Sequence, residues 1–220
     1  MVTTYKKVGV DITEIKKTQN VIGKIISSTY NSQKLAKVEH GFGHYAGIVQ
    51  IPGKKFLATH TDGVGSKIII ANMLKKYDTI GIDCIAMNVN DIICVGATPI
   101  SFVDYIAANK NDQRIFKQIV KGLAYGAKLA QVPIIGGETA IMPDLFSGKK
   151  FAMDLAGTVV GITSKRKMVF GKSIKPGDVI IGIKSSGLHS NGYTLARNVL
   201  LPKYKLNDKI KGIGHLGRSL

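Results

Sequence analysis

Runs of apolar residues divide the chain into short strands and amphipathic helices. Apolar runs at 48–51 and 56–61 flank a Pro-Gly turn, which predicts a β-hairpin. Helical spacing of apolar positions predicts helices over 82–95 and 113–130, and a shorter helix fits 68–76. Further strands are expected at 100–107, 132–135 and 151–162, and residues 1–40 are interpreted as a polar, partly helical entry segment. This mixture of strands and helices predicts an α/β (α+β) fold.

The pattern changes at the basic polar stretch 163–167, which is a candidate domain boundary. A strand is expected after it at 178–183, then a turn over 185–192 and a helix from Tyr193 to Leu200. Glycine-rich segments at 41–47 and 136–139 are expected to be loops, because each follows or precedes a predicted strand.

Composition adds an unusual charge to this picture. The 220 residues include 31 Lys and Arg against 14 Asp and Glu, a net charge of +17, which favours anionic partners. The N-terminus has no secretory signal pattern and no apolar run approaches a membrane span, so a cytoplasmic protein without membrane contact is expected. Cys84 and Cys94 are interpreted as reduced, buried thiols.

The acidic residues are concentrated in one window of this basic chain. Residues 62–104 contain five Asp and three Lys, a net charge of −2. Acids gathered in this way are suited to a divalent cation, and the surrounding Lys residues would attract the phosphates that accompany one. Taken singly, each Asp could equally be a helix cap or a turn former.

The segment 61–67, Thr-Asp-Gly-Val-Gly-Ser-Lys, is a candidate phosphate site. Its glycines allow close backbone approach to an anion, Lys67 supplies charge, and Asp62 could hold Mg²⁺. The spacing is not that of a P-loop, and a plain strand-to-helix turn would use glycine in the same way.

The predicted helix over 82–95 brings further oxygen ligands. Asp83 and Asn90 share a helical face with Asp91 beside it, which would place hard ligands opposite Asp62, although buried Asp and Asn caps are as good an interpretation. His40, His44, His60 and His215 have no ligand-like spacing and are interpreted as surface or packing residues. The turn over 185–192 offers hydroxyl, amide and imidazole donors at a helix N-terminus, where a phosphate or a simple N-cap would fit.

Taken together, these motifs resemble one enzyme family, aminoimidazole ribonucleotide synthetase, also called phosphoribosylformylglycinamidine cyclo-ligase. The resemblance covers nearly the whole chain and rests on motifs in order: 9–12 Gly-Val-Asp-Ile, 61–67, 81–91, 96–99 Gly-Ala-Thr-Pro, 104–105 Asp-Tyr, 136–143, 154–157 and 185–193. It implies ATP-dependent cyclisation of formylglycinamidine ribonucleotide to 5-aminoimidazole ribonucleotide, with release of ADP and phosphate, in purine biosynthesis.

The resemblance also implies roles for residues. Mg²⁺ would be held by Asp62 and Asp91, and Asp62 and His189 would be the catalytic residues. ATP contacts would come from Gly43, Gly63, Gly65, Lys67, Asp83, Asp91, Gly136, Gly137 and Glu138. The substrate, formylglycinamidine ribonucleotide, would contact Ser186, His189, Ser190 and Asn191. His189 is the one nearby group that titrates near neutral pH, which makes it a hypothetical general base or acid.

The family implies a homodimer whose N-terminal domains join their strands in a barrel. The expected division is 1–164, for ATP binding and dimerisation, and 165–220, the start of a substrate-binding domain that relatives continue well beyond Leu220. Two departures from the family pattern are His44-Tyr45 in the glycine-rich entry and an N-terminal helix that lacks the usual small residues.

Three alternatives remain. Sister enzymes share the Asp and Gly pattern: formylglycinamidine ribonucleotide synthase, selenophosphate synthetase, thiamine-phosphate kinase and a hydrogenase maturation factor. Residues 1–40 contain no Cys, in contrast to typical selenophosphate synthetases, and the runs 136–143 and 185–193 favour the cyclo-ligase. A nucleic-acid-binding module would need clustered Lys and stacking aromatics, whereas Lys is scattered and Trp is absent here. An inactive dimerising fragment is the third alternative.

Overall fold

A six-stranded mixed sheet organises the chain in the computed structural model, which describes residues 3–32, 34–146 and 150–220. The sheet order is β1-β2-β3-β6-β4-β5. All neighbouring strands are antiparallel except β4 and β5, which are parallel. The strand bounds are β1 Lys37–His40, β2 Gly47–Ile51, β3 Lys55–Gly63, β4 Thr98–Ala108, β5 Ile134–Ile141 and β6 Met153–Thr163. The hairpin and the strands expected near 100–107 and 151–162 are thus confirmed.

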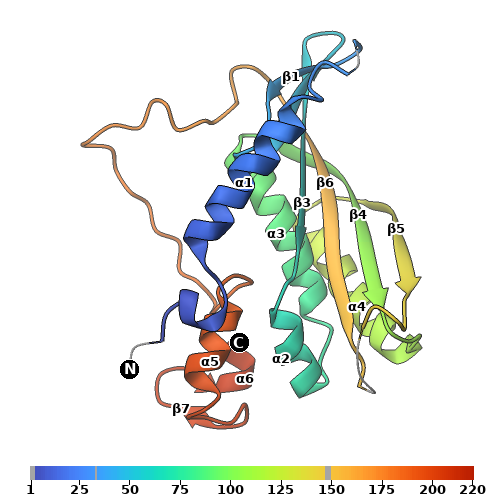
Figure 1. The fold of residues 1–220 in the computed structure, drawn as a ribbon, viewed down its shortest axis with the longest axis vertical. Helices are drawn as coiled ribbons and strands as arrows, with labels where there is room; N and C mark the ends of the chain where they lie inside the picture. The colour runs from blue at the N-terminus through green and yellow to red at the C-terminus, as the bar shows by residue number, and fades with distance from the viewer. Residues whose placement is uncertain (1–2, 33, 147–149) are drawn as a thin grey trace.

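Two helices, α3 (Ile80–Cys94) and α4 (Gln113–Leu129), cover one face of the sheet, as Figure 1 shows. Both were expected from their apolar spacing. Strand β3 directs alternate residues toward this face, so that Phe56 and Ala58 are buried in the core. The helices pack with almost no space at Gly81 and Gly122, where a Cβ would overlap the neighbouring backbone.

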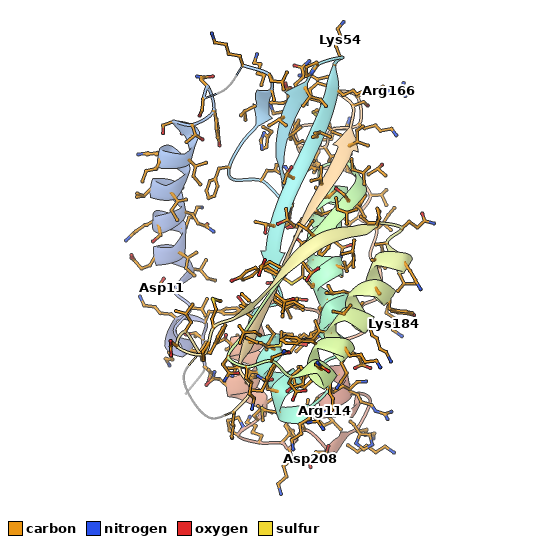
Figure 2. All side chains as sticks on the ribbon, turned by 90° about the vertical axis from the view of Figure 1, so that its right-hand side faces the viewer. Asp11, Lys54, Arg114, Arg166, Lys184 and Asp208 are labelled. Atoms are coloured by element: carbon orange, nitrogen blue, oxygen red, sulfur yellow. The ribbon has the colours of Figure 1, made fainter. Side chains whose placement is uncertain are left out.

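The other helices of the N-terminal part are α2 (Lys67–Leu74), which follows β3, and η1 (Lys6–Val8) and α1 (Ile12–Ser27), which precede the sheet in the chain. Helix α2 follows β3 directly, as expected for 68–76. Helix α1 follows the short helix η1 and begins at Asp11, whose carboxylate accepts hydrogen bonds from the Thr13 and Glu14 amides. Figure 2 shows α1 on one side of the sheet and α4 on the other. None of the described α1 residues is buried.

The C-terminal part forms a small second core against α2. It contains α5 (Tyr193–Leu200), β7 (Lys209–Ile210), β8 (Gly214–His215) and α6 (Leu216–Ser219). Ile70 of α2 is buried together with Tyr193, Leu216 and Leu220. The C-terminal segment is therefore fixed next to the turn that joins β3 to α2.

Three sequence expectations were wrong. Residues 178–183 form no strand: Val179, Ile180, Ile181 and Ile183 are 85–95% exposed, on the long irregular connection from β6 to α5 that Figure 1 shows in orange. Residues 136–139 are not a loop, because pairing with β4 continues β5 through them. Cys84 is buried as expected, but Cys94 is exposed.

Candidate functional site

The end of β3 is fixed to α3 by one buried side chain, Asn88. Its Oδ1 accepts a hydrogen bond from the Asp62 backbone N–H at 2.9 Å. Its Nδ2 donates to the Asp62 carbonyl at 3.2 Å and to the Cys84 carbonyl at 2.9 Å. Asn88 is fully buried, so these partners replace the water that its amide would otherwise bind. The Asp62 peptide is therefore held at a set distance from the helix.

Three side chains converge beside this contact: His60 and Asp62 from β3, and Asp91 from α3. Their potential ligand atoms all lie within 4.8 Å of one another. His60 Nε2 is 3.0 Å from Asp91 Oδ2 and 3.9 Å from Asp62 Oδ2. This arrangement confirms the expected proximity of Asp62 and Asp91 and adds an imidazole that the sequence did not single out.

The charges of this cluster are coupled. The Asp62 side chain contributes most to raising the pKa of His60; burial opposes this increase, while the Asp91 charge adds to it. Burial raises the pKa of the Asp91 carboxyl, the positive charge on His60 opposes this, and Asp62 adds to it. A cation placed among the three groups would relieve the repulsion between the two carboxylates.

Asp83 is not part of this cluster. Its carboxylate pairs with Lys67 Nζ at 2.9 Å, and both side chains are less than one fifth exposed. Burial raises the pKa of Asp83, while the Lys67 hydrogen bond and charge oppose the increase. Lys67 Nζ also donates to the His189 carbonyl at 2.8 Å and lies 5.4 Å from the centre of the Tyr193 ring. Lys67 thus connects α3 to the C-terminal segment.

Most of the predicted site residues line one of two cavities. One, of about 310 Å³, lies between the glycine-containing turn after β3 and the start of α5, and its lining includes Asp62, Gly63, Gly65, Ser190 and Asn191. The other, of about 480 Å³, has Lys67, Asp83, Ser186 and His189 in its lining. The His189 Nε2 atom lies 3.1 Å from the Ser185 hydroxyl and 3.4 Å from that of Ser186.

A third cavity, of about 650 Å³, lies under the glycine-rich loop that contains Gly43. The loop residues 41–47 line it together with part of α1, and His60 and Thr61 of β3 form another part of its wall. Its volume is within the range of small-molecule sites. Gly43 therefore shares a cavity with His60, whereas Ser190 and Asn191 line the cavity that includes Asp62.

The segment Gly136–Glu138 lines none of these three cavities. Gly137 pairs with Asp104, Asp104 pairs with Gly157, and Gly157 pairs with Asp62. Three strand spacings therefore separate Gly137 from Asp62, about 14 Å across the sheet. The expected glycine loop is thus an exposed edge strand beside Asp104. Contact of Gly136, Gly137 and Glu138 with a nucleotide stays a prediction.

Sequence reasoning missed two residues of this region, His60 and Asn88. His60 could have been found from strand alternation, because residues two apart on β3 point to the same face. Asn88 could have been preferred to Asn90, because positions 88 and 91 lie about 60° apart around a helix. Asn90 is exposed and takes no part in the cluster.

Comparison with known proteins identifies a family and close relatives of this chain. The family model described as "AIR synthase related protein, N-terminal domain" matches residues 43–163. A protein of Thermococcus kodakarensis named phosphoribosylformylglycinamidine cyclo-ligase is 48% identical over 211 residues, which are 95% of this chain and 62% of that protein. The Pyrococcus horikoshii protein of the same name is 50% identical over 213 residues, 95% of this chain and 61% of its own length. The chain spans about three fifths of the length of these curated relatives.

Solved structures share the fold at low identity. "AaThiL complexed with AMPPCP and TMP" superposes with a TM-score of 0.54 and 17% identity, over 80% of this chain and 48% of that one. A "HypE-HypF complex" chain has a TM-score of 0.51 and 20% identity, over 71% of this chain and 47% of its own. Among the described residues, every helix is too short or too polar to cross a lipid bilayer.

Proposed function

The chain belongs to the AIR synthase related family, and on this premise we propose that it is the ATP-binding part of a phosphoribosylformylglycinamidine cyclo-ligase. The reaction would convert formylglycinamidine ribonucleotide and ATP to 5-aminoimidazole ribonucleotide, ADP and phosphate. The observation that carries the proposal is the 48–50% identity to enzymes of that name across 95% of the chain.

We assign ATP to the space around the His60 cluster. The cavity under the Gly43 loop has the size of a nucleotide site, and one structure with the same fold is described as a complex with AMPPCP, an analogue of ATP. Gly63 and Gly65 permit close approach of a phosphate to the turn after β3, and Lys67 lies at the end of that turn. Asp83 would act by orienting Lys67.

Mg²⁺ fits the donor set of this site. Asp62 and Asp91 would hold it, because this ion takes one or two carboxylates together with phosphate oxygens and water. When bound, Mg²⁺ supplies positive charge that stabilises the phosphate groups during transfer. The buried His60 Nε2 has no hydrogen-bond partner among the described residues, which is consistent with a site that is completed by a cation.

The substrate would occupy the side formed by the segment 185–192. Ser190 and Asn191 face the turn after β3 across the smaller cavity, and Ser186 and His189 line the neighbouring one. Lys67 Nζ donates a hydrogen bond to the backbone carbonyl of His189, so that this one side chain connects the proposed ATP site to the proposed substrate site. His189 would donate or accept a proton through Nε2, which lies near the hydroxyls of Ser185 and Ser186.

This geometry suits a reaction in two steps. ATP phosphorylates the amide oxygen of the substrate, which makes a poor leaving group a good one. The substrate's own nitrogen then displaces phosphate and closes the imidazole ring. Because the second step is intramolecular, the residues of the segment 185–192 mainly need to hold the reacting atoms together.

The same proposal includes a division of the chain at 164/165 and a homodimer. The face of β4 and β5 away from α3 and α4 offers an apolar surface, because Val103, Tyr105 and Ile135 are all at least 38% exposed. A barrel formed by the sheets of two copies would enclose this face. Light scattering of the purified chain tests this part, and a monomer at high micromolar concentration would refute it.

An assay of ring closure tests the main proposal. The chain, and a version extended to the length of its relatives, would be assayed for ATP- and Mg²⁺-dependent formation of aminoimidazole ribonucleotide. Asp62→Asn and Asp91→Asn in the extended version are expected to lower kcat/KM by about 10²-fold or more. Asp78→Asn, at a half-exposed carboxyl on the surface, is the matched control. Full activity of both cluster variants, or no ring closure by the extended protein, would overturn the proposal.

A further inference from the structure

The imidazole of His60 occupies a position that neither the sequence motifs nor the proposed reaction accounts for. His60 lies two residues before Asp62 on β3, so both side chains point to the same face of the sheet, toward Asp91 on α3. The Nε2 atom is buried and makes no hydrogen bond within the described part of the chain, although the Asp91 oxygen is 3.0 Å away. Buried polar atoms are normally hydrogen-bonded, so a buried nitrogen without a hydrogen bond indicates a bound ligand or a proton.

The distances within the cluster match those between two ligand atoms of one metal ion. With bonds of about 2.1 Å meeting at a right angle, two ligand atoms lie about 3.0 Å apart. His60 Nε2 and Asp91 Oδ2 are 3.0 Å apart, which equals this separation. The Asp62 oxygen, 3.9 Å from Nε2, stays below about 4.2 Å, the largest separation of two atoms bonded to one centre at that length.

The His60 ring also has a backbone neighbour. The Tyr45 backbone lies beside this ring and adds to the increase in the pKa of His60. Histidine ligands of metals commonly donate their second ring nitrogen to a backbone carbonyl, which fixes the tautomer and the ring orientation. Tyr45 belongs to the glycine-rich loop that borders the Gly43 cavity.

We propose that His60 is a third, nitrogen ligand of the divalent cation at Asp62 and Asp91, and that it shifts the preference of the site from Mg²⁺ toward first-row transition metals such as Co²⁺. This inference rests on the metal site of the proposed function but not on ring closure. Mg²⁺ favours oxygen ligands, whereas imidazole favours transition metals, so one His added to two carboxylates changes selectivity.

Metal titration of the purified chain tests the inference without any assay of activity. Calorimetry would give the affinities for Co²⁺ and Mg²⁺ of the unmodified chain, of His60→Asn and of His215→Asn. His215 lies far along the chain in β8, where it contacts the Asn207 carbonyl, and serves as the matched control. His60→Asn is expected to weaken Co²⁺ binding by about 10–100-fold and to change Mg²⁺ binding less than about threefold.

A spectroscopic measurement on the unmodified chain removes any dependence on the folding of a variant. Pulsed electron paramagnetic resonance of the Mn²⁺-loaded chain, without nucleotide, is expected to show coupling to an imidazole nitrogen. Absence of this coupling overturns the inference, as does Co²⁺ affinity that is equal in the unmodified chain and His60→Asn. A chain that binds neither ion also overturns it, since His60 and Asp91 would then be a proton-linked ion pair. Loss of ring closure with nitrogen coupling intact would refute the proposed function alone.

Discussion

Asn88 binds both backbone groups of Asp62: its Oδ1 accepts a hydrogen bond from the Asp62 N–H at 2.9 Å, and its Nδ2 donates one to the Asp62 carbonyl at 3.2 Å. Because Asn88 is fully buried, its replacement by Leu leaves two backbone groups without partners. We expect Asn88→Leu to lower the free energy of unfolding by about 2–3 kcal/mol and to weaken binding of a divalent cation. Chemical denaturation and metal titration would measure the two effects.

Asn90→Leu provides the matched control for this prediction, because Asn90 lies on the same helix but is exposed. It is expected to leave the free energy of unfolding within about 0.5 kcal/mol of the unmodified chain. Equal destabilisation by the two variants would show that the Asn88 contact has no special importance.

The Lys67–Asp83 pair leads to a second prediction. Lys67→Met removes the positive charge from a carboxylate that is only 16% exposed, and also removes the hydrogen bond to the His189 carbonyl. We expect a loss of about 2 kcal/mol in the free energy of unfolding, below the value for a fully buried pair. Hydrogen exchange over 185–193 should be faster as well. Lys76→Met is the control, since Lys76 is more than half exposed, and similar exchange in both variants would contradict the prediction.

The parts of the fold that were predicted from sequence are those in which local pattern and tertiary packing agree. The helices over 80–94 and 113–129 bury an apolar face, so helical spacing found both. The run 178–183 has the same kind of apolar composition as a strand, but no described strand pairs with it. For Gly136 and Gly137, pairing with β4 overrides the low strand propensity of glycine, and only the sheet register reveals this.

The site residues that could be predicted were likewise those set by local sequence, and those set by tertiary contacts were missed. Asp62, Gly63, Gly65 and Lys67 lie in one contiguous motif, so their proximity required no tertiary information. His60 was missed although strand alternation puts it on the same face as Asp62, because its contact with Asp91 joins two separate elements. Asp83 was expected beside Asp62, but the pairing with Lys67 places it in the other cavity.

Asp104 gives a prediction about pH. Burial raises the pKa of its carboxyl, so the folded chain binds a proton there more tightly than the unfolded chain does. The resulting stabilisation is complete below the ordinary pKa of Asp, about 4, and is lost as the pH rises through the higher folded value. Asp104→Asn should therefore raise Tm at pH 7 by about 2 °C, and this difference should disappear near pH 4. Thermal unfolding at both pH values measures it, and a lower Tm for the variant at pH 7 would contradict the assignment.

The close contact of α3 and α4 at Gly81 gives the last prediction. A Cβ at this position would overlap the Ile119 carbonyl oxygen and the Leu123 amide, which are backbone atoms and cannot rotate away. Gly81→Ala must therefore separate the two helices, at a cost of about 3 kcal/mol. Gly182→Ala is the matched control, because nothing lies within 4 Å of a Cβ built there and its backbone conformation suits any residue. Since α3 also carries Asp91, metal affinity should decrease with stability in the Gly81 variant and stay unchanged in the control. Denaturation and metal titration of both variants would test this, and a Gly81→Ala chain with unchanged stability would show that the helices can separate at no cost.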